Sequence, residues 1–305
     1  MPTRIVSFWG KGGTGKTTIA AATSLGLAKE GYSILAVSSD PIPTLCKVIR
    51  GRECLNETLV LNGVSIVELS EEKVIELWKK RFGDEVYEVL SSLLPVGREI
   101  IDYIAGAPGI ADQFLMYYIY EKQRRGDYDY IVWDTPAAGG SIRLLRIEYE
   151  LYRHMGEAAK LYLRVREVFE RIKRREGKSP LKLIEDWRKL AANILSMLAS
   201  KEHSPHIIAT PDELSLSVTR QLEREFRLHG IEAKKIILNM VLEEHVCIEG
   251  LKTLIVSQSA MVRRFIDAYN GMVCTVPFLD EKPHGEKGLL RLWSILKEAN
   301  CIILR

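Results

Sequence analysis

Short apolar runs rich in β-branched residues alternate along the chain with longer segments of helical pattern. Most of these runs are apolar at nearly every position, which is typical of parallel strands that helices cover on both faces. The alternation therefore predicts an α/β fold with a doubly wound, mostly parallel sheet. The runs with the composition of strands are 5–9, 34–39, 64–69, 130–134, 206–209, 235–240 and 272–276.

Two intervals between these strands are much longer than a single crossover helix. In the first, Ser70 has the character of an N-cap, and apolar positions then recur at helical spacing. The second interval has the same spacing and is interrupted near Gly177. We interpret residues 1–305 as one domain, with a helical subdomain inserted from about 70–126 and 144–203.

The bulk composition limits where this domain works. Of 305 residues, 47% are hydrophobic, which is enough for a sizeable core, and the net charge is only +3. So weak a charge argues against nucleic acid as the main partner. The chain shows no basic and apolar leader and no apolar run near the ~20 residues that span a bilayer. We expect a cytoplasmic protein, with a transient place at the membrane if its client is a membrane protein.

The strongest motif follows the first strand. The segment Gly10-Lys11-Gly12-Gly13-Thr14-Gly15-Lys16-Thr17-Thr18 leads into an alanine-rich helix. A strand before it and a helix after it make this a P-loop, whose backbone N–H groups surround the phosphates of a nucleotide. Lys16 is expected at the β- and γ-phosphates, and the Thr17 hydroxyl at Mg²⁺. The motif therefore predicts ATP and Mg²⁺ as ligands.

Two aspartates lie at the carboxyl ends of other predicted strands. Asp134 follows four apolar residues, the form of a Walker B strand, and is expected to hold Mg²⁺ mostly through water. Asp40 ends the second strand and is a candidate to orient the attacking water. The other interpretation of Asp40 is that it caps the next helix. The small residues 137–141 suit a flexible switch loop that senses the γ-phosphate.

Lys11 is not required by an ordinary P-loop. A second lysine at this place resembles the deviant Walker ATPases, a group that includes nitrogenase iron protein, Min- and Par-type ATPases and arsenite-pump ATPases. The resemblance implies a homodimer in which Lys11 reaches the partner's nucleotide, in the manner of an arginine finger. Lys11, Lys16 and Asp40 are then the expected catalytic residues. A solvated loop lysine is the alternative interpretation of Lys11.

Other segments narrow the resemblance to one family. The segments are Thr210 to Ser215 before a helix, Ile237 to Met240, Val276 to Leu279, Pro108 to Ile110, and Gln258. Along nearly the whole chain they resemble the arsenite-pump and tail-anchored-protein targeting ATPases. The resemblance implies that Asn239 recognises adenine and that the loop beginning at Pro277 and Phe278 packs on the base. A turn-forming asparagine is the alternative for Asn239.

The chain also departs from that family. Ile42 and Pro43 follow Asp40-Pro41 where the family usually has alanine and histidine, and Gly140 replaces a usual histidine. Residues 70–200 contain no cysteine, whereas arsenite-pump members bind the metalloid there through thiolates. The zinc-binding C-x-x-C of some targeting members is also missing. Only Cys247, with His245 nearby, is left as a zinc candidate across a dimer.

The five cysteines are scattered and form no C-x-x-C pair. This spacing suggests neither a disulfide framework nor a zinc site. We interpret Cys274 and Cys301, which lie in apolar stretches, as buried thiols.

The function that fits best is an ATPase, converting ATP and water to ADP and phosphate, that delivers a hydrophobic or tail-anchored membrane-protein client. A helical subdomain with an exposed apolar face would then hold a transmembrane helix. The open alternative is that apolar residues such as Phe82, Phe114 and Trp187 pack against one another. Two other functions are considered: the energising subunit of an arsenite efflux pump, and a partition- or Min-type positioning ATPase. No nucleic-acid partner is expected.

Overall fold

The computed structural model confirms the α/β class and describes most of the chain. The described residues are 2–40, 42, 44–54, 58–61, 63–93, 95–170, 180–242 and 249–304.

Within these ranges eight strands form one sheet, with the spatial order β3-β4-β2-β5-β1-β6-β7-β8. The strands are β1 (Arg4–Trp9), β2 (Ile34–Ser38), β3 (Leu59–Leu61), β4 (Val64–Glu68), β5 (Tyr130–Asp134), β6 (His203–Ala209), β7 (Lys235–Val241) and β8 (Val273–Pro277). Only the edge strand β3 is antiparallel to its neighbour, and all other pairs are parallel. β2 and β5 are buried along their whole length, as their continuous apolarity predicts.

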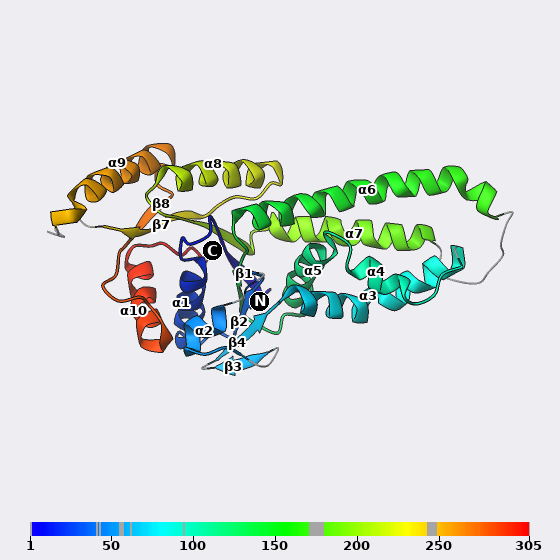
Figure 1. Ribbon diagram of the computed structural model, residues 1–305, viewed down its shortest axis with the longest axis horizontal. Coiled ribbons are helices and arrows are strands. Elements are labelled where there is room, and N and C mark those ends of the chain that lie inside the picture. Colours follow the sequence, from blue (N-terminus) through cyan, green and yellow to red (C-terminus); the bar gives the residue numbers. More distant parts are fainter. Residues whose placement is uncertain are drawn as a thin grey trace. The chain divides into compact units, whose positions relative to one another are not determined.

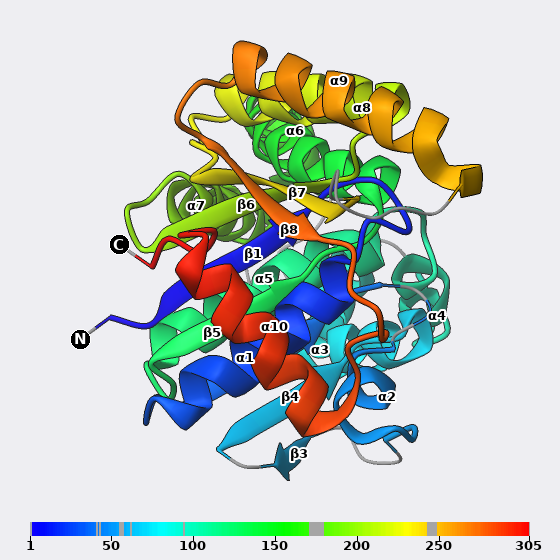
Figure 2. The ribbon, with the colours of Figure 1, turned by 90° about the vertical axis from the view of Figure 1, so that its left-hand side faces the viewer.

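Helices cover both faces of this sheet. Figures 1 and 2 show α1 and α10 on one face and α8 and α9 on the other. The elements concerned are α1 (Lys16–Lys29), α2 (Leu45–Arg50), α8 (Glu213–Leu228), the 3-10 turn η1 (Glu249–Leu251), α9 (Lys252–Ala268) and α10 (Gly285–Glu298). β1 and β5 lie at the centre of the sheet, so the loops that follow them share its carboxyl edge. In open parallel sheets ligands bind at that edge.

The chain forms two compact units. The first comprises Met1–Leu69, Lys122–Ile142 and Ala199–Arg305, and it contains every strand listed above. The second comprises Ser70–Glu121 and Arg143–Leu198. The interpretation of these parts as one ATPase domain with an inserted subdomain stays a proposal.

The second unit is helical. Its elements are α3 (Glu71–Leu93), α4 (Ile100–Ala105), most of α5 (Ile110–Arg125), most of α6 (Ala138–Glu170) and α7 (Pro180–Leu198). The Lys73 N–H donates to Ser70 Oγ over 3.4 Å, the bond expected of the N-cap of α3. Pro180 begins α7, a position where a missing N–H costs nothing. Gly177, where the helical pattern breaks, lies outside the described residues.

The core of the second unit contains a cluster of aromatic rings. The centroid of the Phe82 ring lies 6.2 Å from Phe114 and 5.9 Å from Trp187. Phe82 and Phe114 are buried. For these three residues the structure therefore shows packing against one another, the interpretation that the sequence left open.

The cysteines correct the sequence analysis. Cys46 forms a disulfide with Cys54, with a Cα–Cα distance of 5.9 Å, and Cys274 forms one with Cys301, at 5.6 Å. Both distances lie in the normal range for disulfides. The buried thiols expected at 274 and 301 are wrong, because the start of β8 and the segment after α10 meet in space. Cys247 and His245 lie outside the described residues.

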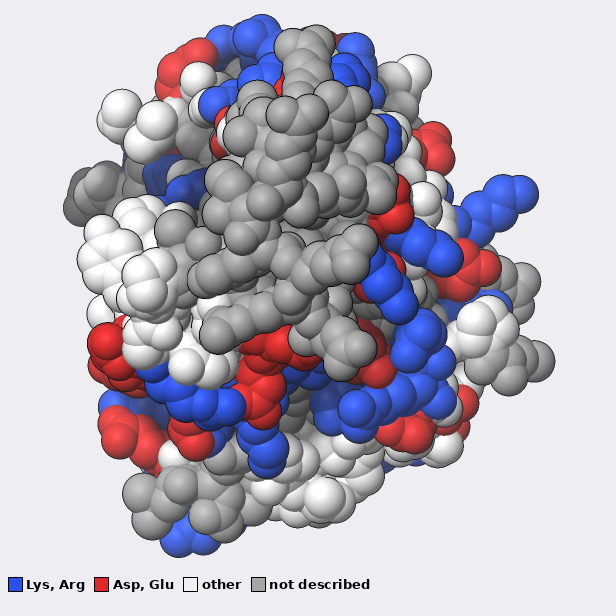
Figure 3. Space-filling view, turned by 90° about the vertical axis from the view of Figure 1, so that its right-hand side faces the viewer, with Lys and Arg blue, Asp and Glu red and all other residues white. Residues whose placement is uncertain are grey.

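Two surface properties complete the description. On the face drawn in Figure 3, Lys and Arg side chains lie among Asp and Glu side chains rather than in a field of one sign. Among the residues that the structure describes, none of the helices combines the length and the apolarity needed to cross a membrane.

Candidate functional site

The loop between β1 and α1 has a positive φ at Gly10, Gly13 and Gly15, and at two of these glycines a Cβ would also clash. Gly10 has φ +146°, and a Cβ there would lie 2.1 Å from the carbonyl oxygen of Ile208. Gly15 has φ +93°, and a Cβ there would lie 2.4 Å from Nδ2 of Asn239. No side chain fits at such distances. Glycine at position 10 therefore allows the end of β1 to approach β6, and glycine at position 15 allows the loop to approach β7. The loop geometry thus explains part of the glycine pattern, and Gly12 and Gly13 lie between these two positions.

Lys16 lies at the start of α1 and is folded into this loop. Its Nζ donates to the carbonyl oxygens of Gly10 and Lys11, each over 3.1 Å. The side chain is buried, and burial lowers the pKa of Lys16, while the nearby carboxylates of Asp134 and Asp40 oppose that shift. An ammonium group held by two carbonyls, with two acids close by, is available to a phosphate that enters the loop.

Asp134 is the most buried acid of this site, with 1% of its surface exposed. Burial raises its pKa to about 6, Thr17, Lys16 and Ser38 oppose the rise, and Asp40 adds to it. Ser38 Oγ donates to Asp134 Oδ2 over 3.2 Å. Asp134 Oδ1 is buried without a hydrogen-bond partner within the described part of the chain. An orphaned carboxylate oxygen beside the Thr17 hydroxyl offers the hard oxygen ligands that Mg²⁺ prefers. The residues present therefore fit a magnesium ion.

Asp40 follows β2 and lies close enough to Lys16 and Asp134 to influence the pKa of both. Its Oδ1 accepts a hydrogen bond of 3.0 Å from the N–H of Ile42. It does not cap the next helix, because α2 has Thr44 at its N-cap position. The carboxylate is thus part of the phosphate-loop surroundings, while Pro41 and Pro43 lie outside the described residues.

The segment after Asp134 corrects another expectation. The sequence suggested a flexible loop over residues 137–141, but α6 begins at Ala138. The Ser141 hydroxyl donates to the carbonyl of Pro136 over 2.5 Å, and the Thr135 hydroxyl donates to the carbonyl of Phe8 over 2.7 Å. These bonds tie the start of α6 to its preceding turn and to β1. Gly139 and Gly140 therefore lie in the first turn of a helix in this structure.

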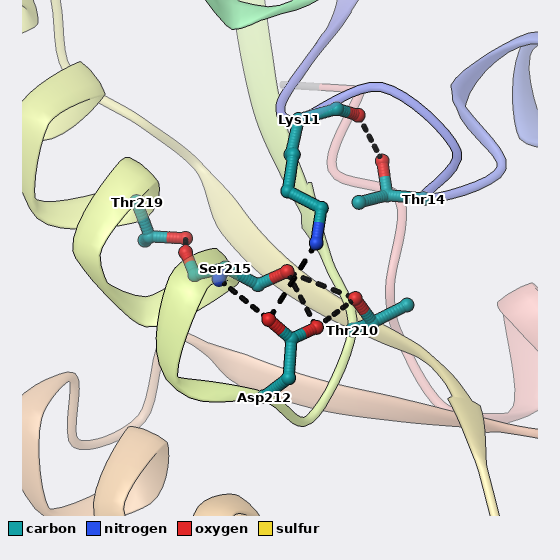
Figure 4. A network of polar contacts seen from close by, with 6 residues as sticks. All are labelled: Lys11, Thr14, Thr210, Asp212, Ser215 and Thr219. Carbon is teal, nitrogen blue, oxygen red and sulfur yellow. Dashed lines mark hydrogen bonds and ion pairs between the residues drawn. The ribbon is translucent and has the colours of Figure 1, made fainter.

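Lys11 takes part in a polar network that the sequence analysis missed. Its Nζ lies 3.6 Å from Asp212 Oδ1. Figure 4 shows this ion pair as a dashed line between the two side chains. Asp212 is the N-cap of α8 and accepts hydrogen bonds from Ser215 N over 2.8 Å and from the Thr210 hydroxyl. Partial burial raises the pKa of Asp212, but the bonds from Thr210 and Ser215 and the Lys11 charge outweigh it, so the net shift is downward. Asp212 is a fixed, charged docking point for Lys11.

The P-loop itself is held in shape by its own side chains. Thr14 Oγ1 donates to the carbonyl oxygen of Lys11 over 3.0 Å. Asn239, 9% exposed, donates from Nδ2 to the carbonyl oxygen of Thr14 over 2.9 Å. Lys11 contacts Asp212 through its side chain. The hydrogen bonds from Thr14 and Asn239 to the loop backbone are therefore kept when the Lys11 side chain moves away from Asp212.

A comparison with protein families identifies the family of the chain that carries this loop. The profile of the family described as anion-transporting ATPase matches residues 3–298. The chain belongs to this family. It is therefore an ATPase, which agrees with the phosphate loop and with the resemblance drawn from the sequence.

Relatives of this ATPase carry two kinds of name. Putative arsenical pump-driving ATPase 2 of Aquifex aeolicus is 29% identical over 82% of this chain and 84% of its own length. Putative arsenical pump-driving ATPase 1 of the same organism is 26% identical over 96% and 78%. ATPase GET3A of Arabidopsis thaliana is 22% identical over 92% and 80%. The chain is similar to both kinds at modest identity.

For the nucleotide base, the predicted residues lie on two neighbouring strands of this ATPase. Asn239 is on β7 and Pro277 ends β8. The Phe278 N–H donates to the carbonyl of Val241 over 2.8 Å, and its side chain is 59% exposed. Adenine recognition by these residues stays a prediction, as do the roles assigned to Lys11, Asp40 and the P-loop residues through Thr18.

Proposed function

We propose that this ATPase works as a homodimeric switch whose nucleotide cycle delivers a hydrophobic client, such as a tail-anchored membrane protein. The observation that carries the proposal is that the side chains of two lysines of one loop lie in different places. Lys16 is folded into the loop, whereas Lys11 extends out of it to a carboxylate on its surface. A lysine that points out of its own phosphate site can serve the site of a second subunit once its side chain leaves Asp212.

Within one subunit, the proposed roles follow the geometry. The backbone from Gly10 to Gly15 surrounds the phosphates, Lys16 neutralises the β- and γ-phosphates, and Thr17 and Thr18 lie in the first turn of α1 behind them. Asp40 orients the attacking water. Thr17 and Asp134 hold Mg²⁺, which when bound supplies positive charge to the phosphate oxygens.

The adenine base is proposed to lie against β7 and β8. The bond from Asn239 to Thr14 uses one of its two amide hydrogens, which leaves a donor and an acceptor oxygen for a base. The exposed ring of Phe278 provides an apolar surface for the base to stack on.

An arsenite-pump role is the alternative, and the cysteines argue against it. Four of the five cysteines are paired, Cys46 with Cys54 and Cys274 with Cys301, so at most one thiol per chain is left. A soft metalloid needs several thiolates at one site. Client delivery needs no thiol, and it is therefore the function we propose.

The test is a trapping experiment with the Asp40→Asn protein, which is expected to bind ATP without hydrolysing it. Co-expression with a tail-anchored membrane protein should give a stable complex on affinity purification. The Lys16→Ala protein, which cannot bind ATP, is the control and should retain nothing. Failure of the Asp40→Asn protein to retain any apolar helix, while it still binds ATP and dimerises, would reject client delivery and leave the ATPase assignment intact.

A further inference from the structure

A small, partly open cavity lies in the second unit, among α3, α5, α6 and α7. Its volume is about 30 Å³. Five aromatic side chains line it, and Glu148 of α6 lines it as well. The rings are those of Trp78, Phe82, Phe114, Tyr117 and Trp187. None of these residues belongs to the ATP site.

The aromatic walls are fixed by ring-to-ring contacts. The Phe82 ring lies 5.0 Å from the Tyr117 ring and 6.2 Å from the Trp78 ring, centroid to centroid. The Phe114 and Tyr117 rings lie 5.4 Å apart. Aromatic faces carry negative partial charge, so the cavity favours a positively charged occupant wherever a ring face, rather than an edge, borders it.

Among the described residues, Glu148 has no hydrogen-bond partner in this cavity. It is 1% exposed, and neither of its carboxyl oxygens has a hydrogen-bond partner within the described residues. Nε1 of Trp187, another lining residue, is buried and without a partner in the same part of the chain. Buried polar groups are nearly always hydrogen-bonded, because leaving one unpaired costs free energy. Three orphaned atoms on residues of one cavity therefore indicate a missing occupant.

The charged groups nearby do not fill this role. Arg81 lies over the Phe82 ring at 4.7 Å and donates to the Tyr117 hydroxyl, and Asp112 is paired with Arg143. Burial is the one cause of the raised pKa of Glu148, so none of these groups offsets it. Among the residues that the structure describes, the carboxyl group has no counter-ion.

The chemistry of the lining selects the class of ligand. An anion would be repelled by the ionised form of Glu148, and a purely apolar molecule would leave the carboxyl group unpaired. A divalent metal ion needs several oxygen or nitrogen ligands. No cluster of three such acidic, histidine or cysteine side chains occurs in the described ranges. An organic cation with N–H donors pairs with the Glu148 oxygens and with the rings, but it offers no acceptor for the N–H of Trp187.

The size of the cavity limits which organic cations can bind. A volume of about 30 Å³ accommodates one or two groups the size of a water molecule, since one needs roughly 10–15 Å³. A tetraalkylammonium head is larger than this. We propose that the cavity binds the head of a primary alkylammonium ion, with Glu148 as its counter-ion and the five rings as its walls.

The proposal predicts that the affinity for an ammonium ion depends on pH. Because burial raises the pKa of Glu148 to about 8, the carboxyl group must lose a proton when an ammonium ion binds. The affinity should rise about tenfold per pH unit between about pH 6 and 8 and then level off, until the amine itself loses its proton near pH 10.

The experiment uses the full chain without nucleotide, so that its result does not depend on the ATPase cycle. Methylammonium chloride is titrated into the protein by calorimetry, at constant ionic strength with NaCl. Saturable binding with the stated pH dependence is expected. A second titration with Nα-acetyl-lysine methylamide tells a free amine from an ammonium group carried on a peptide. Tighter binding of methylammonium or of the lysine derivative would in both cases support a site for a primary ammonium group.

Matched variants and probes decide the outcome. Glu148→Gln keeps the shape of the side chain and should weaken methylammonium binding at pH 8 at least about tenfold. Glu150→Gln removes an exposed carboxylate of the same helix and should bind like the parent. Equal binding by the Glu148→Gln protein would overturn the proposal. So would a methanol affinity equal to that of methylammonium, because the cavity would then hold water only. Should Glu148→Gln fail to fold, a pH-independent affinity in the parent protein overturns it instead.

Discussion

At the scale of single residues, Lys16 and Asp40 have separable roles. Lys16→Ala should abolish ATP binding, because the ammonium group that faces the phosphate loop is lost. Asp40→Asn should keep ATP binding and reduce turnover by about 10²- to 10⁴-fold, the usual contribution of a residue that handles the attacking water. Nucleotide binding and phosphate release are measured side by side.

The control for this pair is Asp267→Asn, which changes an exposed aspartate on α9. It should leave both quantities unchanged. Full turnover in the Asp40→Asn protein would remove Asp40 from the catalytic role.

Asp212 offers a second test at this scale. Asp212→Asn keeps an N-cap for α8 but removes the negative charge opposite Lys11. An exposed ion pair contributes at most about 1 kcal/mol, so freeing Lys11 should favour the ATP-bound dimer by up to about fivefold. Sedimentation velocity with ATP measures the dimer fraction. A weaker dimer would show instead that Asp212 holds Lys11 in its active position.

The residues of the site differ in how far the sequence reveals them. Gly10 to Thr18 form one contiguous motif, and Asp134 ends an apolar strand, so both can be read locally. Asp212 cannot, because its contact with Lys11 depends on β6 and β1 lying side by side. The disulfides fail for the same reason, since the pairing of scattered cysteines is a property of the fold.

At the scale of elements, most of the sheet was predictable, but one edge strand and the start of another strand were not. Seven strands follow from apolar runs, because buried parallel strands need apolar side chains on both faces. The eighth, β3, has only three residues at the sheet edge, too few for a pattern. The start of β6 was missed because Pro205 reads as a strand breaker. It is tolerated because β6 pairs with β7 only from His206 onward.

The start of α6 was also missed. Residues 137–141 are small and glycine-rich, which favours a loop by local propensity. The hydrogen bonds of Thr135 and Ser141 hold this segment as the first turn of α6 instead. Tertiary contacts thus override the weak preference of the sequence.

The buried carboxyl group of α6 makes the stability of the second unit depend on pH. The pKa of Glu148 is raised from 4.5 to about 8 in the folded state, so its stabilising contribution is complete below pH 4.5 and is lost as pH rises toward 8. Relative to Glu148→Gln, the parent should lose free energy of unfolding with a slope approaching about 1.4 kcal/mol per pH unit.

Urea unfolding of both proteins at several pH values, without added amine, measures this difference. Since the glutamine variant lacks the titrating group, all other pH effects cancel. A difference in unfolding free energy that stays constant from pH 5 to 9 would show that Glu148 is solvated or paired in solution.

At the scale of the whole molecule, the paired cysteines predict indifference to metalloids. Arsenite or antimonite should leave the ATPase rate unchanged, because at most one thiol per chain is outside a disulfide. Steady-state phosphate release with and without arsenite measures this under non-reducing conditions. A several-fold stimulation that disappears in the Cys46→Ser protein would restore the pump as the better function.

The dimeric switch is the central claim, and it requires that Lys11 act on the partner's ATP. The Lys11→Ala and Asp40→Asn proteins should each be nearly inactive. In a mixed dimer, however, the Lys11→Ala subunit keeps its Asp40 and receives Lys11 from its partner, so one complete site forms.

The most direct measurement is therefore the ATPase rate of an equimolar mixture of these two proteins. With random pairing about half of the dimers are mixed and each has one working site, so about a quarter of the parent rate should return. A rate equal to the average of the two inactive proteins, or full activity in the Lys11→Ala protein alone, would contradict the account.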